Sequence, residues 1–247
     1  GNVGFHVSDG SYNLFSGNTV RNNANSGINL FDSDTWCVVS GNTVYANAGN
    51  GLYLGNSSNH CTATANAIRG NAQSGVSLYN VADIALRNNV IETNAQNGIW
   101  AGGPSSDLLI VNNLIRNNDT NGIDLDQVNG ANRVEANEID SNGVWGVRLG
   151  WNALDVTLAK NNVRPVGGGT NAVYADHQAG RCTELRNWWG STDSNVILSG
   201  FGGPNVANAV YTPYRLGAVD TTPGADTVAP AAPDTIAATA LTSSTIE

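Results

Sequence analysis

The sequence lacks several features that would indicate other classes of protein. Its 247 residues include no methionine, a single lysine (Lys160) and only 13% charged residues. No apolar run approaches the roughly 20 residues that a helix needs to cross a membrane. We therefore expect a soluble chain without membrane insertion.

Basic residues are also scarce. The chain has 11 basic and 20 acidic residues, a formal net charge of −9 and a pI near 4.6. Nucleic-acid-binding proteins neutralise phosphates with a basic stripe, which this sequence does not have. The charge predicts no nucleic-acid partner, and it favours an extracellular or cell-surface location, where an acidic surface keeps the protein soluble.

What the chain does have is a repeat. Each copy is an asparagine, any residue, Val or Ile, two residues, a second asparagine, three residues and a glycine, followed by an apolar–any–apolar segment. Successive copies begin 24 residues apart, with single steps of 23 and 26. A period of this length is typical of solenoid proteins. The leading asparagines are Asn18, Asn42, Asn66, Asn89, Asn113, Asn137, Asn161 and Asn187.

Three short alternating segments recur within each copy. One follows the repeat glycine (Leu52/Leu54), one is centred on the Val or Ile after the asparagine (Val44), and one precedes the asparagine (Cys37/Val39). Period-two alternation interrupted by Gly and Asn indicates strands and not helices. We predict an all-β fold, a single-stranded parallel β-helix of about eight rungs with three short strands per rung, and an extended C-terminal tail.

The leading asparagines fit the corners of such a coil. Asparagine tolerates left-handed backbone conformations, which glycine adopts freely. Stacked about 4.8 Å apart, the amides would bond to one another along the coil. On these residues, the chain resembles right-handed parallel β-helix proteins of the pectate-lyase-like kind over residues 1 to 215. The resemblance implies the fold and its hand, but the acidic and basic motifs of the polygalacturonase-like, pectate-lyase-like and alginate-epimerase-like members are missing.

The three cysteines fall on one inward position of the repeat. Cys182 lies five rungs from Cys61, roughly 24 Å at parallel-sheet spacing, so these two do not pair. We interpret the cysteines as buried small apolar residues, and a Cys37–Cys61 bridge between stacked rungs stays open as an alternative. No CxxC spacing indicates zinc.

The two ends of the chain differ from the regular rungs. Residue 1 falls inside a repeat, so either earlier residues or a partner should cover that end of the core. We predict a β-helix over 1–216, with Trp189 at an inward position of a Trp-rich C-terminal cap. Residues 217–233 are expected to form a Pro-rich linker. Residues 234–247 resemble the opening strand of a fibronectin type III module, or serve as an assembly tail.

Inward positions form the core, so a functional site must use outward ones. Two outward columns follow the repeat glycine and predict one elongated face, where rings can stack on sugars and charged groups can bond to hydroxyls or uronates. The candidate carbohydrate-binding residues are Phe31, Tyr53, Tyr79 and Trp100. The candidate catalytic residues are Asp124, Asp126, Arg148, Tyr174, Asp176 and His177.

Two schemes of catalysis remain open for this face. Asp126 and Asp176 stand two rungs apart, about 9.6 Å between Cα atoms, with Gly150 leaving a gap between them. Such a separation suits an inverting glycoside hydrolase. Alternatively, Arg148 neutralises a uronate while Tyr174 or His177 removes the adjacent proton, as in a lyase or epimerase.

No cofactor is firmly indicated. The carboxylate pairs Asp32/Asp34 and Asp124/Asp126 are candidate Ca²⁺ ligands. The sequence thus predicts a secreted or cell-surface module that binds, and in one version processes, a polysaccharide or cell-surface glycan. The alternative is a structural or adhesive filament protein that self-associates end to end by stacking its rungs and pairing its tail.

Overall fold

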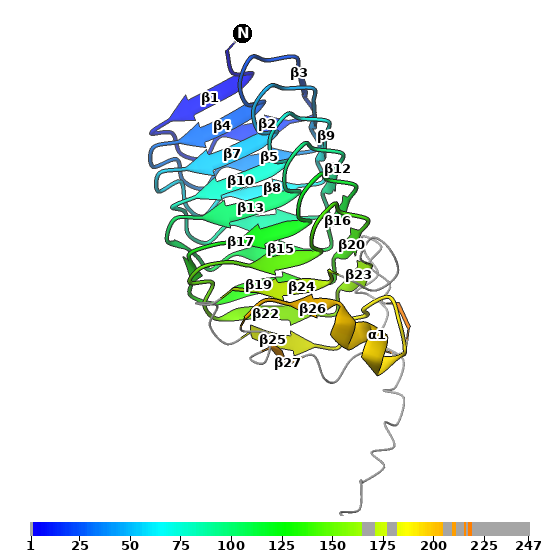
Figure 1. The fold of residues 1–247 in the computed structure, drawn as a ribbon. Coiled ribbons are helices and arrows are strands. Elements are labelled where there is room, and N and C mark those ends of the chain that lie inside the picture. Colours follow the sequence, from blue (N-terminus) through cyan, green and yellow to red (C-terminus); the bar gives the residue numbers. More distant parts are fainter. Residues whose placement is uncertain are drawn as a thin grey trace, which may run out of the picture.

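The structure is a computed structural model, and it describes residues 2–164, 171–176, 182–204, 209, 210, 215, 217 and 218. For residues 182–185, 209 and 210 it describes the backbone only. His177, the side chain of Cys182, most of the predicted linker and the predicted tail 234–247 lie outside the described residues. The described chain is a parallel β-helix whose strands stack rung upon rung from the N-terminus to a short helix, α1 (Ser194–Ser199) (Figure 1).

Three parallel sheets of 9, 9 and 7 strands form its sides. Sheet 1 contains β1 (Phe5–Ser8), β4 (Ile28–Phe31), β7 (Leu52–Gly55), β10 (Val76–Tyr79), β13 (Ile99–Gly102), β17 (Ile123–Leu125), β21 (Val147–Leu149), β24 (Val173–Ala175) and β26 (Phe201–Gly202). Sheet 2 contains β2 (Leu14–Ser16), β5 (Val38–Ser40), β8 (Thr62–Thr64), β11 (Ala85–Arg87), β15 (Leu109–Val111), β19 (Asn132–Glu135), β22 (Val156–Ala159), β25 (Cys182–Leu185) and β27 (Ala209–Val210).

Sheet 3 contains β3 (Thr19–Arg21), β6 (Thr43–Tyr45), β9 (Ala67–Arg69), β12 (Val90–Glu92), β16 (Leu114–Arg116), β20 (Glu138–Asp140) and β23 (Asn162–Arg164). A two-stranded sheet pairs β14 (Ser105–Ser106) with β18 (Val128–Asn129). The predicted three strands per rung and their parallel stacking are confirmed.

The register places repeat positions directly above one another. Leu30 pairs with Leu54, and Leu54 pairs with Leu78. All three are at most 1% exposed, so the inward positions form one continuous apolar column. Cys37 and Cys61 belong to the same core. Both are free thiols, and the Cys37 backbone N–H lies 3.4 Å from Sγ of Cys61, so no bridge links these rungs.

The leading asparagines form the predicted ladder. Asn113 Nδ2 donates to Oδ1 of Asn137 at 3.0 Å and to the Leu86 carbonyl at 2.9 Å, and the pattern repeats along the coil. The left-handed residue at this corner is, however, the one before the asparagine, for example Asn112 at φ 54°. The amide is thereby free to point inward, where its hydrogen bonds replace those that water would make.

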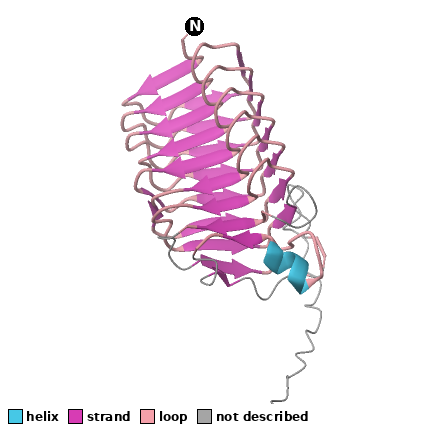
Figure 2. Cartoon of the chain, viewed as in Figure 1, coloured by secondary structure: helices cyan, strands magenta, loops and turns pink. Residues whose placement is uncertain are grey.

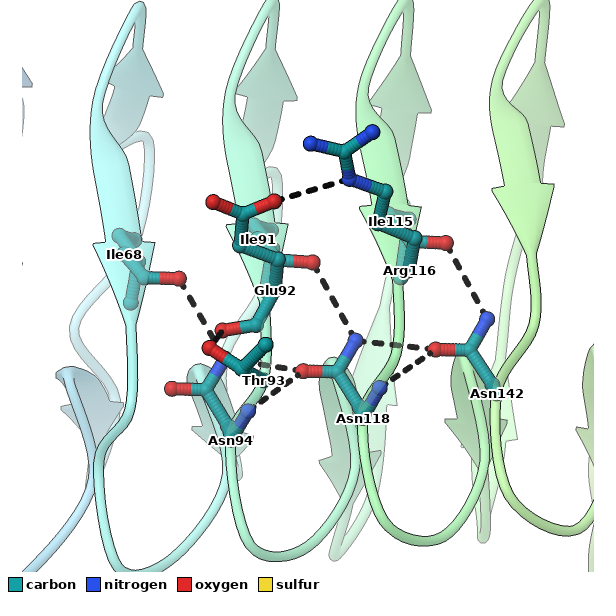
Figure 3. A network of polar contacts seen from close by, with 9 residues as sticks. All are labelled: Ile68, Ile91, Glu92, Thr93, Asn94, Ile115, Arg116, Asn118 and Asn142. Carbon is teal, nitrogen blue, oxygen red and sulfur yellow. Dashed lines mark hydrogen bonds and ion pairs between the residues drawn. The ribbon is translucent and has the colours of Figure 1, made fainter.

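The second asparagine of the repeat builds a parallel ladder. Asn94 Nδ2 donates to Oδ1 of Asn118 at 2.9 Å, and Asn118 donates in the same way to Asn142 at 3.0 Å (Figure 3). The repeat glycine that follows is required by space. A Cβ on Gly98 would lie 2.6 Å from the Gly122 carbonyl oxygen and 2.5 Å from Cγ2 of Ile115. The corners of the coil are therefore fixed by polar bonding and close packing together.

The C-terminal end of the described core is closed by aromatic packing. Trp189 is 2% exposed, as predicted for an inward position, and its ring lies 5.0 Å from that of Phe201 in an edge-on arrangement. Helix α1, drawn in cyan in Figure 2, adds the buried Ile197. Asp193 caps its first turn by accepting from the Asn195 N–H at 2.8 Å. None of the helices in the described part of the chain is long and apolar enough to cross a membrane.

Candidate functional site

The outward face of sheet 1 carries the two predicted columns. In the first, strand pairing aligns Tyr53 with Ser77, Ser77 with Trp100, Trp100 with Asp124, Asp124 with Arg148 and Arg148 with Tyr174. In the second, Phe31 pairs with Gly55, Gly55 with Tyr79 and Tyr79 with Gly102. The structure therefore brings the described candidate residues to one elongated face. The candidate carbohydrate-binding rings lie in its N-terminal half, and the charged residues lie with Tyr174 in its C-terminal half.

The aromatic rings lie along the sheet, over glycines. A Cβ on Gly55 would come within 2.4 Å of the Tyr53 hydroxyl, and one on Gly102 within 2.4 Å of Cζ2 of Trp100. The Tyr79 ring covers Gly103 in the same way, at 2.5 Å. The glycines of the second column thus make room for side chains that would otherwise stand away from the surface.

The rings form two neighbouring pairs. Tyr79 and Trp100 are nearly parallel, with an interplanar angle of 8° and centroids 6.3 Å apart. Phe31 and Tyr53 lie 6.1 Å apart at 34°. Tyr79 is 44% exposed. Burial, with smaller contributions from Tyr79 and Asp32, raises the pKa of the Tyr53 hydroxyl, which keeps it a hydrogen-bond donor. The result is an apolar strip bordered by hydroxyl groups.

Arg148 organises the charged half. Its Nη1 lies 2.8 Å from Oδ1 of Asp124, and its Nη2 lies 3.4 Å from Oδ2 of Asp176. Burial acts to lower the pKa of Arg148, but the carboxylates of Asp124, Asp126 and Asp176 together raise it. The guanidinium therefore stays charged and is held by residues of the rungs on both sides.

Asp124 is the most enclosed group of this cluster. It is 7% exposed, and its second oxygen, Oδ2, accepts from Nδ2 of Asn121 at 3.1 Å. Burial raises the pKa of Asp124, against the opposing effects of Arg148 and Asn121. Asp124 thus positions Arg148 and has little surface of its own to offer a ligand.

Asp126 differs from its two carboxylate neighbours. Its Oδ1 is buried and accepts no hydrogen bond from any described residue. The space over Gly150, expected from the sequence to be a gap between Asp126 and Asp176, is crowded instead. A Cβ at Gly150 would lie 2.8 Å both from Nη1 of Arg148 and from Oδ1 of Asp126. Arg148 therefore lies where the hydrolase scheme needs room for a water molecule.

Two residues of this face were missed in the sequence. Trp145 packs its ring 5.2 Å from that of Tyr174 and lies over Gly202. Asn121 orients Asp124. Both occupy the position before the repeat glycine, whereas the columns were counted from the residues after it. The presence of Trp145, where the five preceding rungs have Ser or Asn, was the available signal.

Asp32, Asp34 and Asp124 of the candidate Ca²⁺ pairs are engaged by protein groups, whereas Oδ1 of Asp126 is not. Asp34 accepts from the backbone N–H groups of Gly10 and Phe31, and Asp32 accepts from Asn56 at 3.1 Å. Asp124 is bonded as described above. Within the described ranges, no group of three or more His, Cys, Asp or Glu side chains is placed to hold a metal ion.

Comparison with known proteins defines the class of this chain. Residues 3–179 match the family described as right handed beta helix region, and the chain belongs to that family. No curated protein sequence matches significantly.

Solved structures share the fold at low sequence identity. The periplasmic alginate epimerase AlgG has a TM-score of 0.64 and 22% identity, over 75% of this chain and 47% of AlgG. The A-module of Azotobacter vinelandii mannuronan C-5 epimerase AlgE6 has a TM-score of 0.55 and 20% sequence identity, over 81% of this chain and 56% of the module. Pectate lyase Pel9A has a TM-score of 0.55 and 18% sequence identity, over 72% of this chain and 50% of the lyase. The matched region spans about half the length of these structures.

Proposed function

We propose that this chain is a carbohydrate-binding β-helix module whose sheet 1 face, from Phe31 to Asp176, binds an extended polysaccharide of neutral sugars. The observation that carries the proposal is the engagement of Arg148 by two carboxylates next to a strip of flat aromatic rings. Rings of this kind stack on the apolar faces of sugars, and carboxylates accept hydrogen bonds from hydroxyls.

Charge distinguishes neutral from acidic ligands. The cluster holds Asp124, Asp126 and Asp176 against Arg148 alone, so its formal charge is negative. A uronate carboxylate would be repelled by this negative charge, and Nη1 and Nη2 of Arg148 already face Asp124 and Asp176. Hydroxyl groups meet no such repulsion. We therefore favour neutral glycans, although the similar folds include alginate epimerases and a pectate lyase.

The location follows from the same proposal. Polysaccharide ligands of this length are encountered outside the cell, and AlgG, which has the same fold, is described as periplasmic. The acidic composition is consistent with an extracellular or cell-surface protein.

The test is a glycan array probed with the full chain and two variants. Trp100→Ala removes a ring from the face, and it should lower binding of neutral glycans by roughly tenfold because stacking is lost. Trp36→Ala is the matched control, because Trp36 is 51% exposed and stacks on His60 away from this face. Equal losses in both variants, or binding confined to acidic glycans, would overturn the assignment.

Processing of the bound glycan is the second candidate. The state of Asp126 favours processing, because its Oδ1 accepts no hydrogen bond from a described residue, while the neighbouring carboxylates of Asp124 and Asp176 are bonded to protein groups. Asp126→Asn should abolish release of reducing ends or unsaturated products from any polysaccharide that the chain cleaves, while binding persists. End-to-end assembly remains the alternative from the sequence; fibres in electron micrographs of the purified chain, without glycan binding, would replace both proposals.

A further inference from the structure

A groove lies on a different side of the coil, beside the C-terminal ends of the sheet 3 strands. Its volume is about 680 Å³, and it crosses four rungs. Small side chains line it, among them Ala24, Ala46, Ala48, Gly70 and Ala72. Its floor contains the second asparagine ladder, in which Asn23 donates to Asn47 at 2.9 Å and Asn47 to Asn71 at 2.9 Å. The floor amides are thus bonded to one another, and the width of the groove is kept by the absence of larger side chains.

An arginine–tyrosine–arginine column directly precedes the groove in sequence, since Arg21, Tyr45 and Arg69 come immediately before its lining residues Asn22, Ala46 and Gly70. Arg21, Tyr45 and Arg69 end successive strands β3, β6 and β9 and pair in register. Cζ of Arg21 lies 6.0 Å from the centroid of the Tyr45 ring, and Cζ of Arg69 lies 5.5 Å from it. A guanidinium beside an aromatic ring is held in place by the cation–π attraction while its N–H groups stay available to a ligand.

The two arginines differ from the other arginines of this sheet. Arg116 bonds to Glu92 at 2.8 Å (Figure 3), and Arg164 is paired with Glu138. Glu92 is the residue in register with Arg69, but its carboxylate turns to Arg116 instead. Arg21 and Arg69 are exposed and form no ion pair with a carboxylate of the described residues.

We propose that this groove is a second binding site, which takes an extended acidic glycan whose carboxylates pair with Arg21 and Arg69. Arg21 and Arg69 stand on strands two rungs apart, about 9.6 Å between Cα atoms at the parallel-sheet spacing, so they suit charges repeated along an extended chain. Arginine is the side chain best suited to bidentate pairing with carboxylates. Charge complementarity supports this occupant, because Arg21 and Arg69 directly precede lining residues of the groove and form no ion pair with a described carboxylate, on a chain with a net charge of −9.

This site is distinct from the sheet 1 face in charge as well as in place. The sheet 1 cluster pairs its single arginine with carboxylates, whereas the groove presents arginines without them. A chain with both sites would contact a neutral polymer on one side and an acidic one on another. Binding of a neutral glycan to the sheet 1 face and binding of an acidic glycan to the groove can therefore be tested, and refuted, independently of each other.

The test is isothermal titration calorimetry of the full chain with hexagalacturonate, using maltohexaose as the neutral probe. The Arg21→Gln/Arg69→Gln variant should lose about 100-fold in affinity for hexagalacturonate, since two charge-assisted contacts disappear. Arg116→Gln is the matched control on the same sheet, and it should change the affinity less than about threefold. Raising the salt concentration should weaken the binding.

Two further variants separate the groove from general charge and from the other face. Ala48→Tyr fills the groove at an exposed position without changing charge, and it should abolish hexagalacturonate binding. Trp100→Ala should leave it unchanged. The proposal is overturned if the unmodified chain does not bind hexagalacturonate, if Arg116→Gln loses as much as the double variant, if Ala48→Tyr binds normally, or if Trp100→Ala loses the binding.

Discussion

Arg148 and Asp124 form an ion pair between successive rungs of sheet 1, with Nη1 2.8 Å from Oδ1. Asp124 sits at an outward strand position and is nevertheless only 7% exposed. The pair therefore combines a largely enclosed carboxylate with a guanidinium that also reaches Asp176. Removing one partner of such a pair lowers the free energy of unfolding by more than the intact pair contributes to it, because the remaining charge is left buried without compensation.

Asp124 should make the stability of the chain depend on pH. Burial raises its pKa above the ordinary value of 3.8 in the folded state, so the folded chain binds this proton more tightly than the unfolded chain does. Its contribution to the free energy of unfolding is full below the ordinary pKa and falls as the pH rises through the raised pKa. Asp124→Asn should reduce that fall.

Urea unfolding between about pH 3 and pH 7 measures this dependence. The matched control is Asp119→Asn, because Asp119 is exposed. An unchanged pH profile in Asp124→Asn, or the same change in both variants, would contradict the raised pKa.

The glycine between the two acidic residues should matter for binding more than for folding. Gly150→Ala introduces a Cβ 2.8 Å from Nη1 of Arg148 and 2.8 Å from Oδ1 of Asp126, so these two side-chain ends must move. Because both are ends of side chains, we expect the free energy of unfolding to change by less than about 1 kcal/mol. Affinity for a neutral glycan should fall. Thermal unfolding and calorimetry, measured together, check this; a variant that binds as the unmodified chain does would refute it.

The leading asparagine ladder should be a main source of stability. Asn113→Ala removes the side-chain bonds to Asn137 and Leu86, and it takes away Oδ1, which accepts from the buried Asn89 backbone N–H at 2.9 Å. We expect the free energy of unfolding to fall by about 3 kcal/mol. Asn112→Ala is the matched control, since other rungs already hold Ala65 and Ala136 at that left-handed position, and it should cost less than about 1 kcal/mol. Chemical denaturation of both variants decides; similar losses would show that the ladder adds little.

The cysteine pair should be unreactive in the folded chain. Cys37 and Cys61 are at most 1% exposed, and burial raises the pKa of Cys61 to about 12. A thiol with such a pKa carries almost no thiolate, which is the reactive form. In a Cys182→Ser variant, a thiol reagent such as DTNB should label these two residues only after denaturation. Labelling of the native chain, or a disulfide found by mass spectrometry, would be the contrary result.

The sequence predicts the core well because the core depends on periodicity. Leu30, Leu54 and Leu78 recur at one inward place of an alternating strand, and strands of one length stack in register. Trp189 was assigned to the core for the same reason. The sequence pattern shows that the repeat glycine recurs but not why; the structure shows that Gly98 is required for close packing against the next rung.

The candidate site was only partly predictable. The columns fix which residues share a face, but not how far a long side chain reaches. Arg148 turns toward both Asp124 and Asp176 and lies over Gly150, which no spacing rule shows. Trp145 and Asn121 were missed because their position precedes the glycine from which the columns were counted.

Inward positions stabilise the fold and outward positions carry the groups that can contact a ligand, and this separation affects how substitutions change the surface. The asparagine ladders and the close-packed glycines hold each rung regardless of what the outward places carry, as shown by aligned neighbours as different as Ser77, Trp100 and Asp124. Exchanges at these places therefore alter ligand preference without re-engineering the scaffold. Outward side chains of successive rungs are therefore spaced about 4.8 Å apart along the coil, and each can be exchanged almost independently of the others.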